Sequence, residues 1–172
     1  RHKYRYIITV VDLLSRYGWG KRLAKVTSKD INNFLLEIIE EQRKCPKYVY
    51  HDNGKVFESY EFHAFLERNK IKSLPTAIYH PQANPVERFN RSITEGVRVM
   101  IAKDPTKQYR WATVLNDILL NINTKYNDVT NLTPFEVLYG MTYENKMKQK
   151  PYNENYHNEL KNIAFMRSKL RF

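Results

Sequence analysis

The segment that most constrains this chain runs from residue 50 to residue 91, where two acidic residues flank a polar, proline-rich loop. Asp52 follows a short apolar run and precedes Gly54, a pattern typical of an aspartate at the end of a strand before a turn. Glu87 comes after 34 intervening residues, where a helical pattern begins, and residues 79–85 form the loop before it. Two carboxylates on separate rigid elements can bind hard divalent cations, and two such cations can clamp the attacking and leaving oxygens of a phosphodiester.

Each carboxylate also has a simpler structural interpretation. Asp-Asn-Gly is a common turn, in which the aspartate accepts hydrogen bonds from the backbone. An acidic residue in the first turn of a helix complements the helix dipole, and that role is compatible with metal binding. The residue types of Asp52 and Glu87 therefore permit a metal site but do not by themselves require one.

Apolar patterning places these carboxylates among short strands and amphipathic helices. β-branched and aromatic residues indicate strands at residues 4–11, 17–23, 48–51 and 71–74. Helical spacing predicts helices at residues 86–102 and 111–122, one that Pro46 ends, and one that runs to about Asn69. The expected N-terminal caps are Thr27 or Ser28, Ser59 and Thr133, and Gly140 is a good stop for the last short helix.

The chain is long enough for one domain with a tail, and its character changes after residue 140. We expect a core at residues 1–140 and a basic extension or linker helix at residues 141–172. The extension holds seven Lys or Arg and three Glu, and residues 158–172 have the pattern of a basic helix. Its interpretations are sequence-independent affinity for DNA or a solvated helix packed on a neighbouring subunit.

The net charge of +11 favours a polyanionic partner, of which nucleic acid is the commonest, although solubility alone also explains a basic chain. The single cysteine, Cys45, excludes an internal disulfide and fits a reducing compartment. Five scattered histidines and one cysteine do not match the spacing of a structural zinc site. No apolar run is long enough to span a membrane, and the first residues are too polar for a secretory signal.

Four motifs together resemble one known family. HDNGKVF, YHPQANPVERFNR and NLTPFEVLYG look like the catalytic core of retroviral and gypsy-type retrotransposon integrases, and YIITVVDLLSRYGW looks like the second strand of that core. The motifs occur in the family's order and cover residues 4–140 approximately. The resemblance implies an α/β fold, a ribonuclease-H-like mixed sheet flanked by helices.

The resemblance also implies an activity, which is metal-dependent DNA 3′-end processing and strand transfer into target DNA. Asp52 and Glu87 are then the catalytic metal ligands, and hard carboxylate oxygens select Mg²⁺ or Mn²⁺ in a two-metal site. The expected partners are duplex DNA and at least one further copy of the chain. The apolar face of residues 111–122 is either a dimer interface, as in similar cores, or internal. Nuclear action is expected from the substrate, because no localisation signal is evident.

Five polar residues near the two carboxylates are candidates for DNA contact, since their types suit phosphate oxygens and base edges. The alternative for each of them is an ordinary solvated loop or helix face. These residues are Asn53, Gln82, Asn84, Arg88 and Arg91.

The first departure from the family concerns its third carboxylate, an aspartate on the first strand. Asp12 is separated from Asp52 by 39 intervening residues and is an alternative ligand, but in similar integrases the aspartate of this motif is non-catalytic. The catalytic aspartate would then lie before Arg1. We therefore expect the first ligand and the central first strand to be missing from these 172 residues, which leaves backbone groups unpaired.

The second departure is the spacing between Asp52 and Glu87, which is one residue shorter than is usual in the family. The difference falls in HPQANPVE, where relatives usually have a glycine. A deletion beside a metal ligand would weaken the case for activity. Two rival functions therefore stay open: a domesticated or degenerate integrase-like protein that binds DNA or protein without catalysis, and a related nuclease that cuts without joining.

Overall fold

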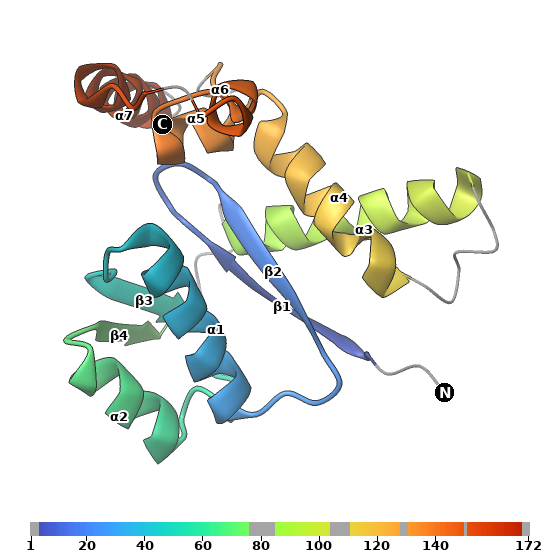
Figure 1. Cartoon of the computed structure of the whole chain (residues 1–172). Helices are drawn as coiled ribbons and strands as arrows, with labels where there is room; N and C mark the ends of the chain where they lie inside the picture. The colour runs from blue at the N-terminus through green and yellow to red at the C-terminus, as the bar shows by residue number, and fades with distance from the viewer. Residues whose placement is uncertain (1–3, 76–84, 104–110, 128–130, 150, 170–172) are drawn as a thin grey trace. The chain divides into compact units, whose positions relative to one another are not determined.

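The computed structural model describes residues 4–75, 85–103, 111–127, 131–149 and 151–169. The chain folds into two compact units, and Figure 1 shows the order of their elements along the chain. Unit 1 comprises Arg1–Ile8 and Lys21–Ala83, and unit 2 comprises Thr9–Gly20 and Asn84–Phe172. None of the helices in the described ranges is long and apolar enough to cross a membrane.

A hairpin of β1 (Tyr6–Val11) and β2 (Gly18–Leu23) contributes to both units, because the boundary between the units crosses each strand. The Asp12 N–H donates to the Tyr17 carbonyl at 2.9 Å and closes the turn of the hairpin. The two strands predicted near the start of the chain are confirmed, with ends that differ by one or two residues.

Unit 1 has two helices whose beginnings were predicted from their caps. The Thr27 side chain accepts the Asp30 N–H at the start of α1 (Ser28–Gln42), and the Ser59 side chain caps α2 (Tyr60–Arg68) in the same way. The hydroxyls of Ser28 and Ser59 also hydrogen-bond each other at 2.7 Å. The N-termini of the two helices are therefore tied together.

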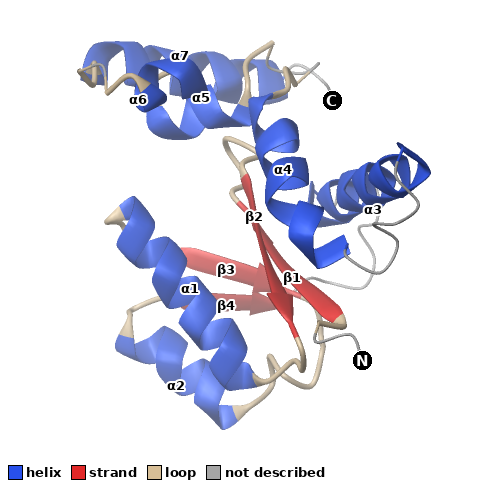
Figure 2. Cartoon of the chain, turned by 45° about the vertical axis from the view of Figure 1, so that its right-hand side comes forward, coloured by secondary structure: helices blue, strands red, loops and turns tan. Residues whose placement is uncertain are grey.

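The same unit contains the parallel pair β3 (Tyr48–His51) and β4 (Lys72–Pro75), and Figure 2 shows α1 and α2 beside it. Alternation along β3 leaves Tyr48 and Tyr50 exposed and turns Val49 and His51 inward. The buried apolar residues of this unit come from both helices and from the segments that precede or follow them. They are Leu23, Ile31, Phe34, Leu35, Phe62, Leu66 and Ile71.

The strands form two separate sheets within the described residues, one antiparallel hairpin and one parallel pair. An antiparallel and a parallel pairing are thus both present, but in two sheets rather than in the single mixed sheet expected from the sequence. No described strand pairs with both β1 and β3, so these residues contain no central strand.

Unit 2 is built on two packed helices, α3 (Pro85–Lys103) and α4 (Trp111–Thr124). They approach closely at Gly96, where an added Cβ would lie 2.8 Å from a side-chain carbon of Ile118. Along the apolar face of α3, Phe89 and Ile93 are buried, and Val86, Val97 and Met100 are half-buried. On α4 the buried apolar residues are Val114, Leu115 and Ile118, so much of this face is internal to the unit.

Three shorter or later helices complete unit 2: α5 (Pro134–Tyr139), α6 (Tyr143–Met147) and α7 (Glu154–Lys169). The predicted cap of α5 is a full capping box, in which Thr133 and Glu136 bond each other's backbone N–H groups. The stop at Gly140 is confirmed, with a φ of 68°.

Some boundaries differ from the sequence prediction for local reasons. Helix α1 ends at Gln42, before Pro46, because Arg43 adopts a left-handed conformation and its N–H bonds the Glu40 and Ile39 carbonyls. Helix α6 was not predicted, and α7 begins four residues before the predicted basic helix. The domain division at residue 140 stays a prediction.

Candidate functional site

Asp52 lies directly after β3 and is exposed. Its Oδ1 accepts the Gly54 N–H at 3.0 Å, so the expected aspartate turn is present. Within the described residues its other oxygen, Oδ2, makes no hydrogen bond. The strand therefore delivers a fixed carboxylate with an oxygen directed to solvent.

His51 holds the backbone at this strand end, a role that sequence analysis did not assign to it. Its Nδ1 lies 2.7 Å from the Asp52 carbonyl, and its Nε2 lies 2.7 Å from the Ser73 hydroxyl on β4. The imidazole also stacks on Phe57, with ring centroids 5.1 Å apart. The alternation along the strand could have indicated that His51 faces inward. Its hydrogen-bond partner Ser73 could not have been predicted, because it lies on another strand.

Glu87 lies in the first turn of α3, where the helix dipole favours a negative charge. Its side chain is 63% exposed, and its Oε1 lies 3.6 Å from the Arg91 guanidinium one turn later. The helix start is anchored by its neighbours: Phe89 packs where Gly18 has no side chain, and Asn90 accepts a hydrogen bond from Thr9 at 2.8 Å. A solvent-facing carboxylate therefore sits on a firmly packed helix.

Asp12 has a structural role within the hairpin turn. Its Oδ2 accepts both the backbone N–H and the hydroxyl of Ser15 at 2.7 Å, and Ser15 is buried. Its backbone carbonyl accepts the Arg16 N–H. These bonds give Asp12 a structural role in the turn, and its part in metal binding stays a prediction.

The structure distributes the predicted residues over both units. Asp52 and the exposed Asn53 belong to unit 1, whereas Asp12 and Glu87 belong to unit 2, with Arg88 and Arg91 exposed beside Glu87. The candidate DNA contacts Gln82 and Asn84 lie outside the described residues. No group of three or more His, Cys, Asp or Glu side chains in the described ranges is arranged to hold a metal ion.

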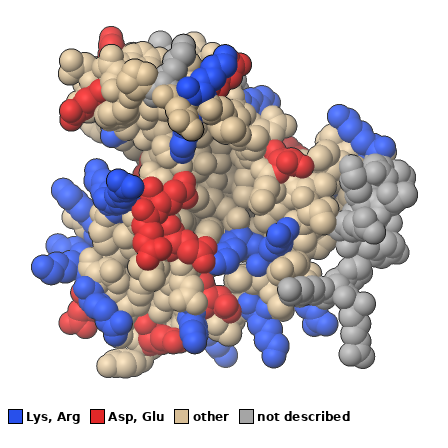
Figure 3. Space-filling model, viewed as in Figure 1, with Lys and Arg blue, Asp and Glu red and all other residues tan. Residues whose placement is uncertain are grey.

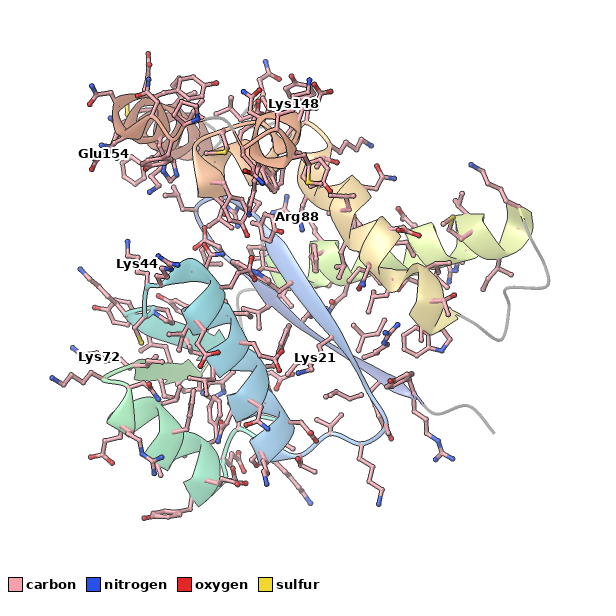
Figure 4. All side chains as sticks on the ribbon, in the orientation of Figure 1. Lys21, Lys44, Lys72, Arg88, Lys148 and Glu154 are labelled. Carbon is pink, nitrogen blue, oxygen red and sulfur yellow. The ribbon has the colours of Figure 1, made fainter. Side chains whose placement is uncertain are left out.

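Arg16 is a feature that only the structure reveals. It has a φ of 64°, in the left-handed region, and its side chain is half-buried. Burial lowers the pKa of the Arg16 guanidinium, the positive charge of Arg88 lowers it further, and Asp12 opposes the shift. Two like charges therefore act on each other where the hairpin turn meets the start of α3, and Figure 4 shows where Arg88 lies.

We expect Arg16→Gly to increase the free energy of unfolding by about 1 kcal/mol. Glycine adopts a positive φ without the cost that a side chain imposes there, and the change removes a partly buried charge next to Arg88. The measurement is urea unfolding beside Arg16→Ala, which removes the charge but keeps the backbone strain and should gain less. A loss of stability in Arg16→Gly would instead mean that the guanidinium makes a stabilising contact.

The described elements form a helix-rich α/β fold that is similar to the ribonuclease-H-like fold of integrase catalytic cores. Residues 1–81 match the family model described as "Integrase core domain". The chain is 26% identical over 143 residues to the Pro-Pol polyprotein of feline foamy virus and 29% identical over 138 residues to the Gag-Pol polyprotein of feline leukemia virus. Both matches cover 80% of the chain, but only 12% and 8% of the polyproteins, so the chain corresponds to a small part of each relative.

Solved structures give the same fold. The HTLV-2 integrase catalytic core domain, solved in complex with magnesium, matches with a TM-score of 0.63 and 23% identity, covering 76% of this chain and 82% of that chain. A simian T-cell lymphotropic virus intasome in complex with the PP2A regulatory subunit B56 gamma matches with a TM-score of 0.69 and 20% identity, covering 86% of this chain and 51% of that chain. Together with the sequence matches, these likenesses support a retroviral-type integrase catalytic core, which confirms the resemblance predicted from the motifs.

Proposed function

We propose that this chain is the core of a retroelement integrase that processes DNA 3′ ends and joins them to target DNA. The observation that carries the proposal is the pair of solvent-facing carboxylates, Asp52 at the end of β3 and Glu87 in the first turn of α3. Both occur within motifs that resemble those of integrase cores. The proposed partners are duplex DNA and further copies of the chain, and the proposed place of action is the nucleus.

The donor set suits a hard divalent cation, Mg²⁺ or Mn²⁺. Both carboxylates offer oxygen ligands, and Asp52 keeps one oxygen without a hydrogen-bond partner among the described residues. When bound, two such ions supply Lewis-acid activation of the phosphodiester and of the attacking oxygen. The magnesium complex of the HTLV-2 core domain supports the choice of metal.

The protein's own contribution is to hold and orient groups. His51 and the Gly54 N–H fix the position of Asp52, so little reorganisation is needed when a cation is bound. Arg91 lies beside Glu87 and forms a weak, exposed ion pair with its carboxylate. A bound divalent cation would take the place of Arg91 as the partner of this carboxylate. Asn53, Arg88 and Arg91 would contact phosphates of the DNA, as would Gln82 and Asn84, which precede α3 in the sequence.

A second candidate function is DNA or protein binding without catalysis by a degenerate integrase-like protein. A specific observation favours it: the Asp52–Gly54 bond and the Glu87–Arg91 pair account for both carboxylates without any metal. A third candidate is a nuclease of the same fold that cuts DNA without joining it.

One assay separates the three functions. The longest natural polypeptide that carries this sequence is incubated with labelled duplex oligonucleotides and Mg²⁺ or Mn²⁺, with EDTA as the control. Metal-dependent joined products are expected. Shortened strands without joined products would indicate the nuclease, and binding without either product would contradict catalysis and leave the binding protein.

A further inference from the structure

Two loops of unit 1 lie side by side at the end of the parallel sheet where β3 and β4 begin. Residues 43–47 connect α1 to β3, and residues 69–71 connect α2 to β4. The Lys72 N–H donates to the Lys47 carbonyl at 3.0 Å, and the Cys45 Sγ lies 3.3 Å from the Asn69 carbonyl. These two contacts fix the loops to each other although they are far apart in the sequence.

Six exposed basic residues gather on these loops and on the residues that flank them. We call this group the basic pole; it consists of Arg43, Lys44, Lys47, Arg68, Lys70 and Lys72. Figure 4 shows Lys44 and Lys72 directed outward from this part of unit 1, and Figure 3 shows basic side chains along the same edge. Three acidic residues lie next to the group, Glu40 and Glu41 in the last turn of α1 and Glu67 in the last turn of α2, so the positive charges outnumber the negative ones by three.

None of the six makes an ion pair within the described part of the chain, where the salt bridges are Lys21–Glu37 and Glu87–Arg91. Their positive charges are therefore not neutralised by direct contact with a carboxylate. A surplus of one sign of charge raises the local concentration of oppositely charged partners.

Helix dipoles explain only some of these charges. Basic residues at a helix C-terminus interact favourably with the last carbonyls, which accounts for Arg43 and Arg68. Lys47 and Lys72 lie at the starts of strands, beyond the last turn of either helix, where the dipole has little effect. The side-by-side placement of the two loops, rather than helix capping, concentrates the charge.

The basic pole is distinct from the carboxylate that we assign to catalysis. Lys47 precedes β3 and Asp52 follows it, so they lie at opposite ends of one strand, roughly 16 Å apart at about 3.3 Å per residue. Phosphates held at the basic pole are therefore not the phosphate that Asp52 would act on.

We propose that the basic pole binds the phosphate backbone of duplex DNA without regard to sequence, as a contact separate from the reacting site. Lysines predominate, and they act as point charges on phosphates rather than as readers of bases. Tyr48 is 47% exposed and lies opposite Lys72 in the β3–β4 register. Its aromatic ring would contact the sugars of the DNA backbone beside the phosphates that the lysines bind. Binding of this kind needs no metal and does not depend on the proposed catalysis.

The test measures binding of the same natural polypeptide to a fluorescent duplex in EDTA over a range of salt concentrations. The test variant carries Lys44→Gln, Lys47→Gln, Lys70→Gln and Lys72→Gln. The control carries the same loss of charge at exposed lysines outside the basic pole, with Lys25→Gln, Lys29→Gln, Lys125→Gln and Lys148→Gln. Circular dichroism and urea unfolding verify that both variants fold.

We expect the test variant to lose roughly ten- to a hundredfold in affinity at about 100 mM salt. Its log–log salt slope should be shallower by up to about 3.6, because each of the four phosphate contacts contributes about 0.9. The control should change much less. Equal losses in both variants would overturn the proposal, since net charge alone would then explain them. Unchanged DNA binding in the test variant would also overturn it. A parallel titration with polyglutamate identifies a surface for acidic polypeptides, because the test variant would then lose affinity for polyglutamate and keep its affinity for DNA.

This result is independent of the proposed reaction. The binding is measured in EDTA, where the metal-dependent reaction cannot occur. If joining fails in every protein while the basic-pole variant still loses affinity, catalysis is contradicted and the binding surface stands.

Discussion

Glu87→Gln is expected to reduce strand transfer by about a thousandfold while leaving the fold unchanged. Under the proposed function, the change removes an anionic ligand and weakens the binding of a divalent cation whose stabilisation of developing charge would amount to several kcal/mol. About 4 kcal/mol corresponds to a factor of about 10³ in rate. The exposed ion pair to Arg91 contributes less than about 0.5 kcal/mol to folding, so stability should hardly change. The measurement is joined product per unit time with Mn²⁺, alongside urea unfolding.

The matched control is Glu95→Gln, which removes the same charge from an exposed position on the same helix two turns later. Its joining rate should stay within about twofold of the parent, because it lies beyond the first turn that carries the candidate ligand. Equal rates in the parent, Glu87→Gln and Glu95→Gln would remove Glu87 from the metal site. Equal losses in the two variants would instead point to charge as the cause.

Gly140→Ala is expected to lower the free energy of unfolding by roughly 2–4 kcal/mol. The position has a φ of 68°, where a side chain costs about 1–2 kcal/mol. An added Cβ would also lie 2.4 Å from the Cβ and Cγ of His157, and overpacking of this kind costs about 1–3 kcal/mol. The measurement is the midpoint and slope of urea unfolding.

The physical consequence of Gly140→Ala extends beyond one clash. His157 is buried, its Nε2 lies 2.9 Å from the Val137 carbonyl, and its Nδ1 lies 2.6 Å from the Tyr152 hydroxyl. Displacing its ring would break the contact that docks α7 on α5 and expose the buried Leu160 and Ala164. Loss of protection from hydrogen exchange should therefore be largest in α7.

Gly20→Ala is the control for this prediction. Its added Cβ would meet only the flexible end of Leu119, at 3.1 Å, and its backbone is not in the left-handed region. A cost of about 1 kcal/mol or less is expected. If Gly140→Ala were no more costly than Gly20→Ala, the close packing of α7 against α5 would be contradicted.

Local signals predicted the elements whose ends are set by short-range chemistry. Thr27, Ser59 and Thr133 cap helices as predicted, since a side-chain oxygen bonds an N–H only three residues away. The bounds of β3 and the stop at Gly140 were also predicted, because they too depend on residues within a few positions of the boundary. The end of α1 was missed, because arginine seldom adopts the left-handed conformation that stops the helix at Arg43.

For the candidate site too, some features follow from the sequence and others only from the fold. Sequence alone placed Asp52 at a strand end and Glu87 in a first helical turn, since both positions depend on neighbouring residues. It could not give the bonds of His51 to Ser73, the turn role of Asp12, or the effect of Arg88 on Arg16. Each of these depends on side-chain directions or on contacts between segments that the chain order does not specify.

By itself, the sequence determined the strands, the capped starts of α1, α2 and α5, and the motifs that indicated an integrase core, because those depend on residue type and spacing over a few positions. Only the tertiary structure decided which segments meet. It docked α7 through His157 on α5, and it placed the loop before β3 beside the loop before β4. The basic pole exists for that reason: its charges come from two loops more than twenty residues apart, and only the parallel pairing of β3 with β4 brings them together.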